Sequence, residues 1–206
     1  MFLGLKNLIN QYNLEIKGII HIGAHYGQEY GSYIENNIKN LMFFEPLKNN
    51  YQVLLSNIQL SDTVKAYNIA LGNTVGEIEM FVETANQGMS SSILEPSLHL
   101  KQYPHITFNN KETVKIDRLD NIDFNKEDFN LINIDVQGYE LEVFKGATDV
   151  LNHINLVYAE INRDELYKNC VQVDELDAFL GTFGFKRGAT AWNGVTFGEA
   201  LYLKNI

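Results

Sequence analysis

Residues 18–30 read Gly-Ile-Ile-His-Ile-Gly-Ala-His-Tyr-Gly-Gln-Glu-Tyr, an apolar run that stops at Gly23 and continues into a helix-like segment through Gly27. Its three isoleucines predict a short buried strand. Two glycines after such a strand let the backbone turn tightly and approach a ligand, and the N–H groups of the following helix point at that ligand. The stretch is typical of a nucleotide-type cofactor site, although glycines in a strand–helix turn also occur for packing alone.

A second apolar strand follows Gly23 by roughly twenty residues, the spacing of α/β cofactor domains. This strand, Leu41-Met42-Phe43-Phe44, ends in Glu45-Pro46, where such domains place a carboxylate for the ribose hydroxyls. The dinucleotide fingerprint needs a third glycine in the turn, and this turn offers only Gly23 and Gly27. A cofactor without a pyrophosphate therefore fits better, and S-adenosylmethionine is the common one.

The length and composition limit the class of protein to which the chain can belong. The chain has 206 residues, 45% of them hydrophobic, so we expect a single domain over residues 1–206 with an N-terminal helix within residues 1–17. A net charge of −10 argues against a nucleic-acid partner, because phosphate binding depends on clustered Lys and Arg. The sequence shows neither a secretory signal nor a membrane-spanning run, and the single Cys170 excludes an internal disulfide. We expect a cytoplasmic protein without stable membrane insertion; its oligomeric state stays open.

Strands and helices alternate along the chain. The expected helices are residues 2–16, 28–37, 49–58 and 139–151, and one capped by Asp174 that runs through Leu180. The expected later strands are residues 64–72, 76–82, 129–135 and 154–160, and two more between residues 184 and 204. This alternation predicts an α/β fold with a parallel sheet and right-handed crossovers.

Residues 83–113 lack clear periodicity and contain the run Ser90-Ser91-Ser92. Loops of this length in a compact domain tend to be lids or binding loops, so we expect a substrate or lid loop here, with a surface excursion as the alternative. Ser91 and Ser92 are candidate substrate contacts through their hydroxyls; a simple turn is the other interpretation.

Two acidic residues follow strands. Asp135 and Glu160 each end a predicted strand, and ligands in open α/β sheets bind beyond the carboxyl ends of the strands. We therefore expect Asp135 to face the same crevice as Gly23 and Glu45, and Glu160 to repeat this arrangement.

The chain resembles the FkbM family of S-adenosylmethionine-dependent methyltransferases. The matching stretches run in the family's order and are residues 21–29, 43–46, 68–72, 90–92, 114–120 and 134–147. The resemblance implies a Rossmann-like class I methyltransferase fold: a seven-stranded, mostly parallel sheet with helices on both faces and a C-terminal antiparallel hairpin. It also implies methyl transfer from S-adenosylmethionine, commonly to a hydroxyl of a sugar, a glycan or a small natural product.

The resemblance also assigns roles to residues. Gly23, Ala24 and Gly27 would line the methionine side of the cofactor, and Glu45 would take the ribose hydroxyls. Asn68 to Ala70 would border the adenine, and Asp135 would stand at the methyl-transfer end. The predicted cofactor-binding residues are therefore Gly23, Ala24, His25, Gly27, Glu45, Pro46, Asn68, Ile69, Ala70 and Asp135.

Four positions depart from the family's usual pattern. His21 and His25 stand where members often have Asp and Asn, and we assign His21 a structural role and His25 a cofactor contact. Asn133 and Gln137 stand where members usually have Lys and Glu. These two changes together remove an opposite-charge pair beside Asp135.

Methyl transfer to an alcohol needs a base, because a hydroxyl is a poor nucleophile while it keeps its proton. Asp135 and Glu160 are the predicted catalytic residues; the alternatives are helix capping for Asp135 and a structural ion pair for Glu160. A divalent metal held by these two residues is conceivable, but no cluster at ligand spacing supports one, so we predict no metal.

Two other functions stay open at this point. An NAD-dependent dehydrogenase shares the glycine turn and Glu45 but needs the missing third glycine. A non-catalytic cofactor-binding protein of the same fold is compatible with the altered Asn133 and Gln137.

Overall fold

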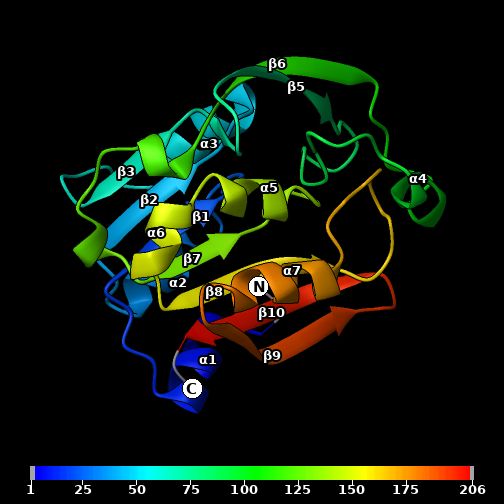
Figure 1. Cartoon of the computed structure of the whole chain (residues 1–206). Helices are drawn as coiled ribbons and strands as arrows, with labels where there is room; N and C mark the ends of the chain where they lie inside the picture. The colour runs from blue at the N-terminus through cyan, green and yellow to red at the C-terminus, as the bar shows by residue number, and fades with distance from the viewer. Residues whose placement is uncertain (1–2, 205–206) are drawn as a thin grey trace.

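The computed structural model describes residues 3–204. Its main feature is a seven-stranded sheet in the order β3-β2-β1-β7-β8-β10-β9 (Figure 1). The strands of this sheet are β1 (Gly18–Ile22), β2 (Asn40–Phe44), β3 (Val64–Tyr67), β7 (Leu131–Ile134), β8 (Leu156–Asn162), β9 (Phe185–Asn193) and β10 (Phe197–Lys204).

The pairing of the strands fixes where a ligand can sit. β1 is parallel to β2 and to β7, with Ile19 opposite Leu41 on one side and opposite Leu131 on the other. β10 is antiparallel to both β8 and β9, which confirms the expected C-terminal hairpin and the class I methyltransferase topology. Because the chain moves outward from β1 through β2 to β3 and then returns to β7, the strand order reverses between β1 and β7.

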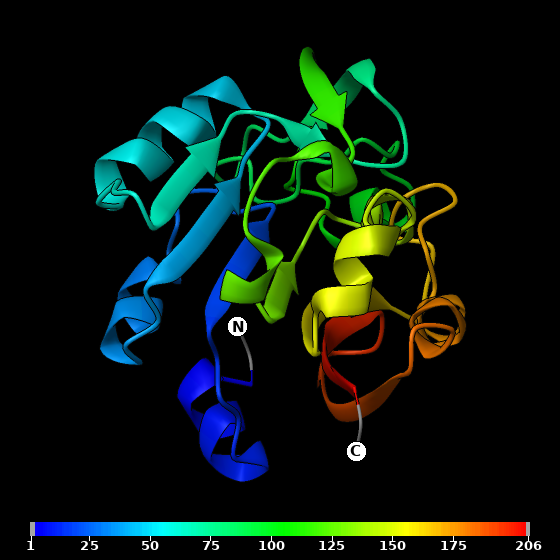
Figure 2. The same ribbon diagram turned by 60° about the vertical axis from the view of Figure 1, so that its left-hand side comes forward.

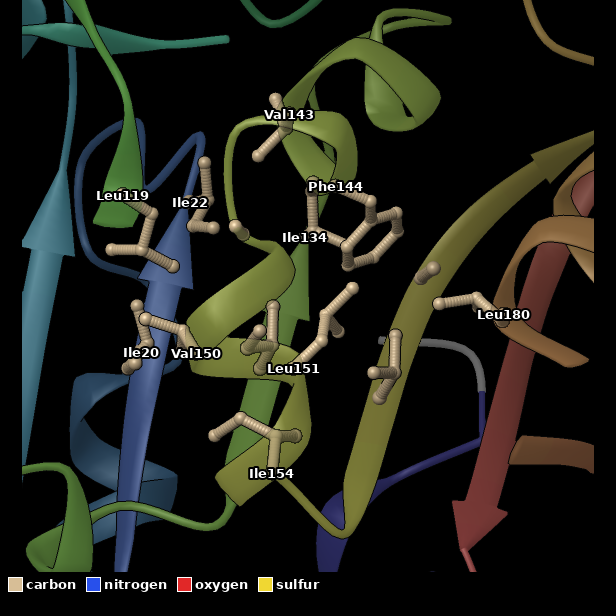
Figure 3. Close-up of a cluster of buried hydrophobic side chains, with 14 of the residues drawn as sticks. Ile20, Ile22, Leu119, Ile134, Val143, Phe144, Val150, Leu151, Ile154 and Leu180 are labelled. Atoms are coloured by element: carbon tan, nitrogen blue, oxygen red, sulfur yellow. The ribbon is translucent and has the colours of Figure 1, made fainter. Parts of the chain in front are cut away.

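Helices cover both faces of this sheet, as expected. Side chains alternate between the two faces along each strand, so neighbouring residues enter different cores. One face packs against α5 (Glu140–Lys145), α6 (Thr148–His153) and α7 (Val173–Gly181), and the other against α1 (Leu5–Tyr12), α2 (Tyr30–Glu35) and α3 (Lys48–Asn57). Figure 3 shows the first of these cores, in which Phe144 and Val143 of α5 approach Ile134 and Ile22 of the strands.

A second, three-stranded sheet lies beyond the ends of β2 and β3 (Figure 2). It consists of β4 (Ala70–Leu71), β6 (Asn110–Asp117) and β5 (Gly76–Val82), in that order. The remaining elements are α4 (Leu98–Gln102) and the 3-10 turns Leu119–Asn121 and Lys126–Asp128. Within residues 3–204, no helix is both long and apolar enough to cross a membrane.

The expected strand 64–72 is wrong in its extent. The chain leaves the main sheet after Tyr67 and joins the small sheet at Ala70. The side chain of Asn68 donates hydrogen bonds to the carbonyl oxygens of Glu45 and Pro46. This bridging amide holds the turn between the two strands.

The expected helix 139–151 is two helices, α5 and α6, which are separated at Gly146 and Ala147. A Cβ atom on Gly146 would lie 1.8 Å from the backbone oxygen of Gly72. The helix therefore breaks where it meets the chain that enters the small sheet, a tertiary contact that periodicity does not encode.

Three further boundaries differ from expectation. The N-terminal helix covers residues 5–12 rather than 2–16, and residue 2 lies outside the described residues. Gln172, not Asp174, caps α7: its side chain accepts from the N–H of Glu175, whose side chain accepts from the N–H of Gln172. The expected loop 83–113 contains α4 and ends where β6 begins at Asn110.

We expect Phe144→Ala to lower the free energy of unfolding by about 3–5 kcal/mol, because it leaves a cavity beneath α5 in the core of Figure 3. Urea unfolding followed by circular dichroism measures this loss. Ile34→Ala is the control, since Ile34 is 47% exposed on α2, and we expect it to cost well under half as much. Equal losses for the two variants would contradict this assignment of the core.

Candidate active site

A cavity of about 710 Å³ opens at the carboxyl ends of the central strands. Ligands in open α/β sheets bind at this edge, close to the point where the strand order reverses. Segments 21–25, 44–47, 69–71, 86–93, 133–137, 158–160 and 193–199 contribute to its wall. Within the described part of the chain, no Lys or Arg lines this cavity, whereas five carboxylates do: Glu29, Glu45, Asp135, Glu160 and Glu199.

Gly23 brings the turn after β1 against the loop after β7. Its φ is +77°, and a Cβ atom here would lie 1.9 Å from the backbone oxygen of Asp135, so any side chain would push the two loops apart. The N–H groups of Gly23 and Ala24 both donate to the carbonyl oxygen of Phe44. Gly23 and Ala24 line the cavity.

Gly27 does not belong to the cavity wall. Its φ is +74°, and a Cβ atom here would lie 2.6 Å from Cδ1 of Leu54. The structure therefore gives this glycine a packing role against α3 and does not bring it to the expected cofactor contact.

Glu45 is a buried carboxylate at the end of β2 that two backbone groups hold. Its Oε2 accepts from the N–H of His25 and its Oε1 from the N–H of Leu47, both at 2.9 Å. Burial raises the pKa of Glu45 to about 7, although these two hydrogen bonds and one from Asn50 oppose the rise. Pro46 lines the cavity beside it.

The residues of the segment Asn68 to Ala70 have different roles. Ile69 and Ala70 line the cavity, whereas Asn68 is outside the wall. Since the Asn68 amide donates to the carbonyl oxygens of Glu45 and Pro46, it supports the Glu45 side of the cavity from behind.

His25 links the glycine turn to the loop over the cavity. Gln28 Nε2 donates to His25 Nδ1 at 2.8 Å, so the ring proton is on Nε2, which donates to the carbonyl oxygen of Gln87 at 2.8 Å. Its backbone has a positive φ of 47°. The side chain lines the cavity and joins two loops that are far apart in the sequence.

His21 belongs to a buried neutral network. Asn133 Nδ2 donates to the hydroxyl of Tyr33 at 2.7 Å, and that hydroxyl lies 3.2 Å from His21 Nδ1. Burial lowers the pKa of His21, which keeps the imidazole neutral and able to accept the Tyr33 proton. Asn133, one of the departures from the family pattern, thus donates a hydrogen bond that holds this network.

Asp135 and Glu160 lie side by side, and Gln137 bridges them. Gln137 Nε2 donates to Asp135 Oδ1 at 2.7 Å and to Glu160 Oε2 at 3.0 Å. Glu160 is buried, whereas Asp135 is exposed to solvent. The loss of hydration raises the pKa of Glu160, and repulsion by Asp135 adds to this rise. The structure therefore brings both predicted catalytic residues to one place, where an acidic group can take up a proton.

Glu140 adds a third carboxylate behind this pair. Its Oε1 accepts from the N–H groups of Val136 and Gly138, while its buried Oε2 has no hydrogen-bond partner among the described residues. Oxygen atoms of Asp135, Glu140 and Glu160 lie within 4.8 Å of one another. A divalent cation takes such ligands, but the Gln137 amide already donates to two of the three groups, and the absence of a metal stays a prediction.

The loop over the cavity is built on Glu83, whose role the sequence pattern did not reveal. The Glu83 carboxylate accepts from the backbone N–H groups of Ala85, Asn86 and Gly88. The two candidate serines differ in position: Ser91 lines the cavity, and its Oγ accepts from the N–H of Glu83. Ser92 is completely buried and donates to the carbonyl oxygen of Gln137 at 2.9 Å, so it ties this loop to the carboxylate pair and does not face the cavity.

The sequence did not predict the contacts of Gln137 and Tyr167 in the site; it offered Tyr167 only as an aromatic residue that could stack on a sugar ring or pack in the core. Gln137 was visible as a departure from the family pattern, but its contact with Glu160 spans 23 residues. Tyr167 lies outside every matched motif, and its hydroxyl is within hydrogen-bond distance of Gln137 Oε1 and of the carbonyl oxygen of Ser90.

Known proteins resemble the chain in sequence and in fold. The 2-O-methyltransferase NoeI of Sinorhizobium fredii is 26% identical to it over 182 residues, which are 82% of this chain and 75% of NoeI. A putative tRNA (m1A22) methyltransferase of Streptococcus pneumoniae, Sp1610, has a TM-score of 0.54 at 11% identity and covers 97% of this chain and 68% of its own.

Magnesium protoporphyrin IX methyltransferase from Synechocystis PCC 6803, solved with bound S-adenosylmethionine, has a TM-score of 0.53 at 8% identity. The similarity covers 96% of this chain and 74% of that one. These two proteins share the fold and are named for different acceptors, so the fold alone does not identify the acceptor.

The sequence profile of the FkbM methyltransferase domain matches residues 21–187, a range that contains the glycine turn, Glu45 and both carboxylates of the pair. Membership in this family excludes the alternative function of an NAD-dependent dehydrogenase. The chain belongs to the FkbM methyltransferase family and is an S-adenosylmethionine-dependent methyltransferase.

Proposed function

We propose that this enzyme methylates a hydroxyl group of a sugar, a glycan or a related small molecule. The observation that carries this proposal is the pair Asp135 and Glu160, two carboxylates held together in the cavity that Gly23 and Glu45 also line. A hydroxyl acceptor needs a group that takes its proton. The similarity to a protein named as a 2-O-methyltransferase supports transfer to oxygen.

The cavity suits S-adenosylmethionine. Gly23 supplies a stretch of backbone without a side chain for the methionine part, and Glu45 supplies a carboxylate for the ribose hydroxyls. Ile69 and Ala70 would border the adenine, with Pro46 and His25 beside the ribose. Gly27 and Asn68, also expected to touch the cofactor, lie outside the cavity wall, so we assign Gly27 to packing and Asn68 to the support of Glu45.

When bound, S-adenosylmethionine supplies an electrophilic methyl group. We place Glu160 as the residue that accepts the proton of the attacking hydroxyl, because it lies on β8, which is one strand farther than β7 from the glycine turn. Asp135 shares the Gln137 amide with Glu160 and orients the acceptor. The cavity would hold the methyl donor and the acceptor next to each other, which is the main contribution a protein makes to such a displacement.

The charge of the cavity wall supports a neutral acceptor. Its carboxylates are not accompanied by Lys or Arg anywhere in the described wall, so a phosphate-bearing acceptor would meet repulsion. Ser91 and the aromatic residues Tyr103 and Phe197 line the same cavity, and aromatic rings with nearby hydroxyls suit the apolar and polar surfaces of a sugar ring. On this basis we keep nucleic acid out of the proposed partners.

The first test is calorimetric titration with S-adenosylhomocysteine and, separately, with NAD. We expect binding of the thioether alone, and a loss of at least tenfold in affinity for Glu45→Ala, because the ribose hydroxyls lose their acceptor. Glu77→Ala is the control, since Glu77 is an exposed glutamate on β5 and its loss should change nothing. A preference for NAD would refute the cofactor assignment.

The affinity for S-adenosylhomocysteine should also depend on pH through Glu45. Burial raises the pKa of Glu45 to about 7 in the free protein, and ribose hydroxyls favour the charged carboxylate as their acceptor. We therefore expect the affinity to rise about tenfold between pH 6 and pH 8, as the charged fraction grows through the pKa. Calorimetry on Glu45→Gln should show a weaker affinity without this rise; the same rise in the variant would assign it to another group.

Transfer of a labelled methyl group to a panel of neutral glycosides tests the catalytic pair. We expect Glu160→Gln to lower kcat by roughly 10²–10⁴-fold, the usual contribution of a general base. Asp135→Asn should lower kcat while its affinity for S-adenosylhomocysteine stays within a few fold of the wild type. A loss of cofactor affinity in Asp135→Asn would make this residue a cofactor ligand, and cofactor binding without turnover on any acceptor would support the non-catalytic alternative.

A further inference from the structure

Gln137 occupies the centre of the carboxylate site. It follows β7 with a positive φ of 55°, a backbone conformation that directs its side chain into the space between the ends of β7 and β8. Both hydrogen atoms of its Nε2 amide are used, one for Asp135 and one for Glu160. One neutral group therefore joins two acids that would otherwise repel each other.

Other contacts fix Gln137 in this position. Its Oε1 lies 2.9 Å from the hydroxyl of Tyr167, which is also 2.8 Å from the carbonyl oxygen of Ser90. The backbone oxygen of Gln137 accepts from Ser92 Oγ. Every polar atom of the side chain thus has a partner, and the loop over the cavity holds the residue from two sides.

The described side chains that line the cavity around the pair include several acids and no Lys or Arg. The carboxylates of Glu29, Glu140 and Glu199 repel negative charge on the pair. Glu29 directly precedes α2, Glu140 begins α5 and Glu199 lies on β10. Burial, together with the carboxylates of Glu160, Asp135 and Glu140, keeps the nearby Tyr167 hydroxyl protonated by raising its pKa. None of the ion pairs found among the described residues includes Asp135 or Glu160, so the Gln137 amide is the main donor that the side chains offer to them.

We propose that Gln137 is a positioning residue for methyl transfer, whose amide holds Asp135 and Glu160 together as a charged pair at the acceptor end of the cavity. This role rests on the proposed function, in which these carboxylates orient and deprotonate the acceptor. The side-chain chemistry is specific: Glu has the same length but no donor, Met has the same length but no polar hydrogen, and Asn is shorter by one methylene. Among these side chains, only glutamine combines this length with two N–H groups and no charge.

The test compares the affinities for S-adenosylmethionine and S-adenosylhomocysteine between pH 5.5 and pH 8.5, measured by calorimetry. The two ligands differ by the methyl group and by the positive charge of the sulfonium, which a charged carboxylate pair attracts. The ratio of the two affinities therefore reports the charge of the pair, and the contribution of Glu45 cancels because both ligands carry the same ribose. No acceptor is needed for this measurement.

The variants are Gln137→Glu and Gln137→Met, with Gln52→Glu as the control for added charge on an exposed position of α3. In the wild type we expect the preference for S-adenosylmethionine to fall as the pH falls and the pair takes up protons. Both Gln137 variants should move the midpoint of this fall upward by about one pH unit, because the charged pair loses its shared donor. The control should keep the wild-type midpoint.

Binding of S-adenosylhomocysteine by each variant shows that its cofactor site is folded. An unchanged midpoint in both Gln137 variants would overturn the role, even if their overall affinities fall, because a purely structural residue would lower both affinities without moving the midpoint. A wild-type ratio that does not change with pH would overturn it as well. Failure of the wild type to bind either ligand would instead refute the cofactor site, and with it the role that depends on that site.

Discussion

The site depends on the contact between Gly23 and the backbone of Asp135. A Cβ atom on residue 23 would lie 1.9 Å from the Asp135 oxygen, so the turn after β1 and the loop after β7 meet only because this residue has no side chain. That contact lies at the point where the strand order reverses, which is where an open α/β sheet leaves room for a ligand. Gly23 therefore determines both the shape of the cavity and the position of the carboxylate pair.

Neutral donors, rather than cations, hold the buried acids of this protein. Backbone N–H groups hold Glu45, Glu83 and Glu140, and the Gln137 amide holds the pair beyond them. A fixed Lys or Arg in the same place would neutralise these acids permanently. Neutral donors add no charge of their own, and burial raises the pKa of Glu45 and of Glu140 to about 7, so these acids can gain or lose a proton near neutral pH.

Much of the fold could be predicted from the sequence, because the central strands are buried on both faces and read as apolar runs that glycine or an acid ends. The pattern could not show that residues 64–72 enter two sheets, since Asn68 makes that turn by bonding to residues more than twenty positions away. The break in the helix at Gly146 has the same origin, a contact with Gly72. Strand ends identified Glu45, Asp135 and Glu160 correctly as neighbours of one cavity, whereas Gln137 and Tyr167 act through long-range contacts without a local signature.

The two departures from the family pattern near Asp135 have a common result: each puts a neutral amide where family members usually have a charged side chain. Asn133 points to the face of the sheet that packs on α2 and joins Tyr33 and His21 in a neutral network. Gln137 lies past the end of the same strand and joins the two acids. With a lysine in place of Asn133, the network would contain a buried cation that nothing in it could neutralise, because burial keeps His21 uncharged and Tyr33 protonated. With a glutamate in place of Gln137, the site would contain another acid without a donor. The exchange of both residues removes one charge of each sign and leaves a network in which amides supply the hydrogen bonds, and in the described cavity wall no Lys or Arg stands beside Asp135 and Glu160.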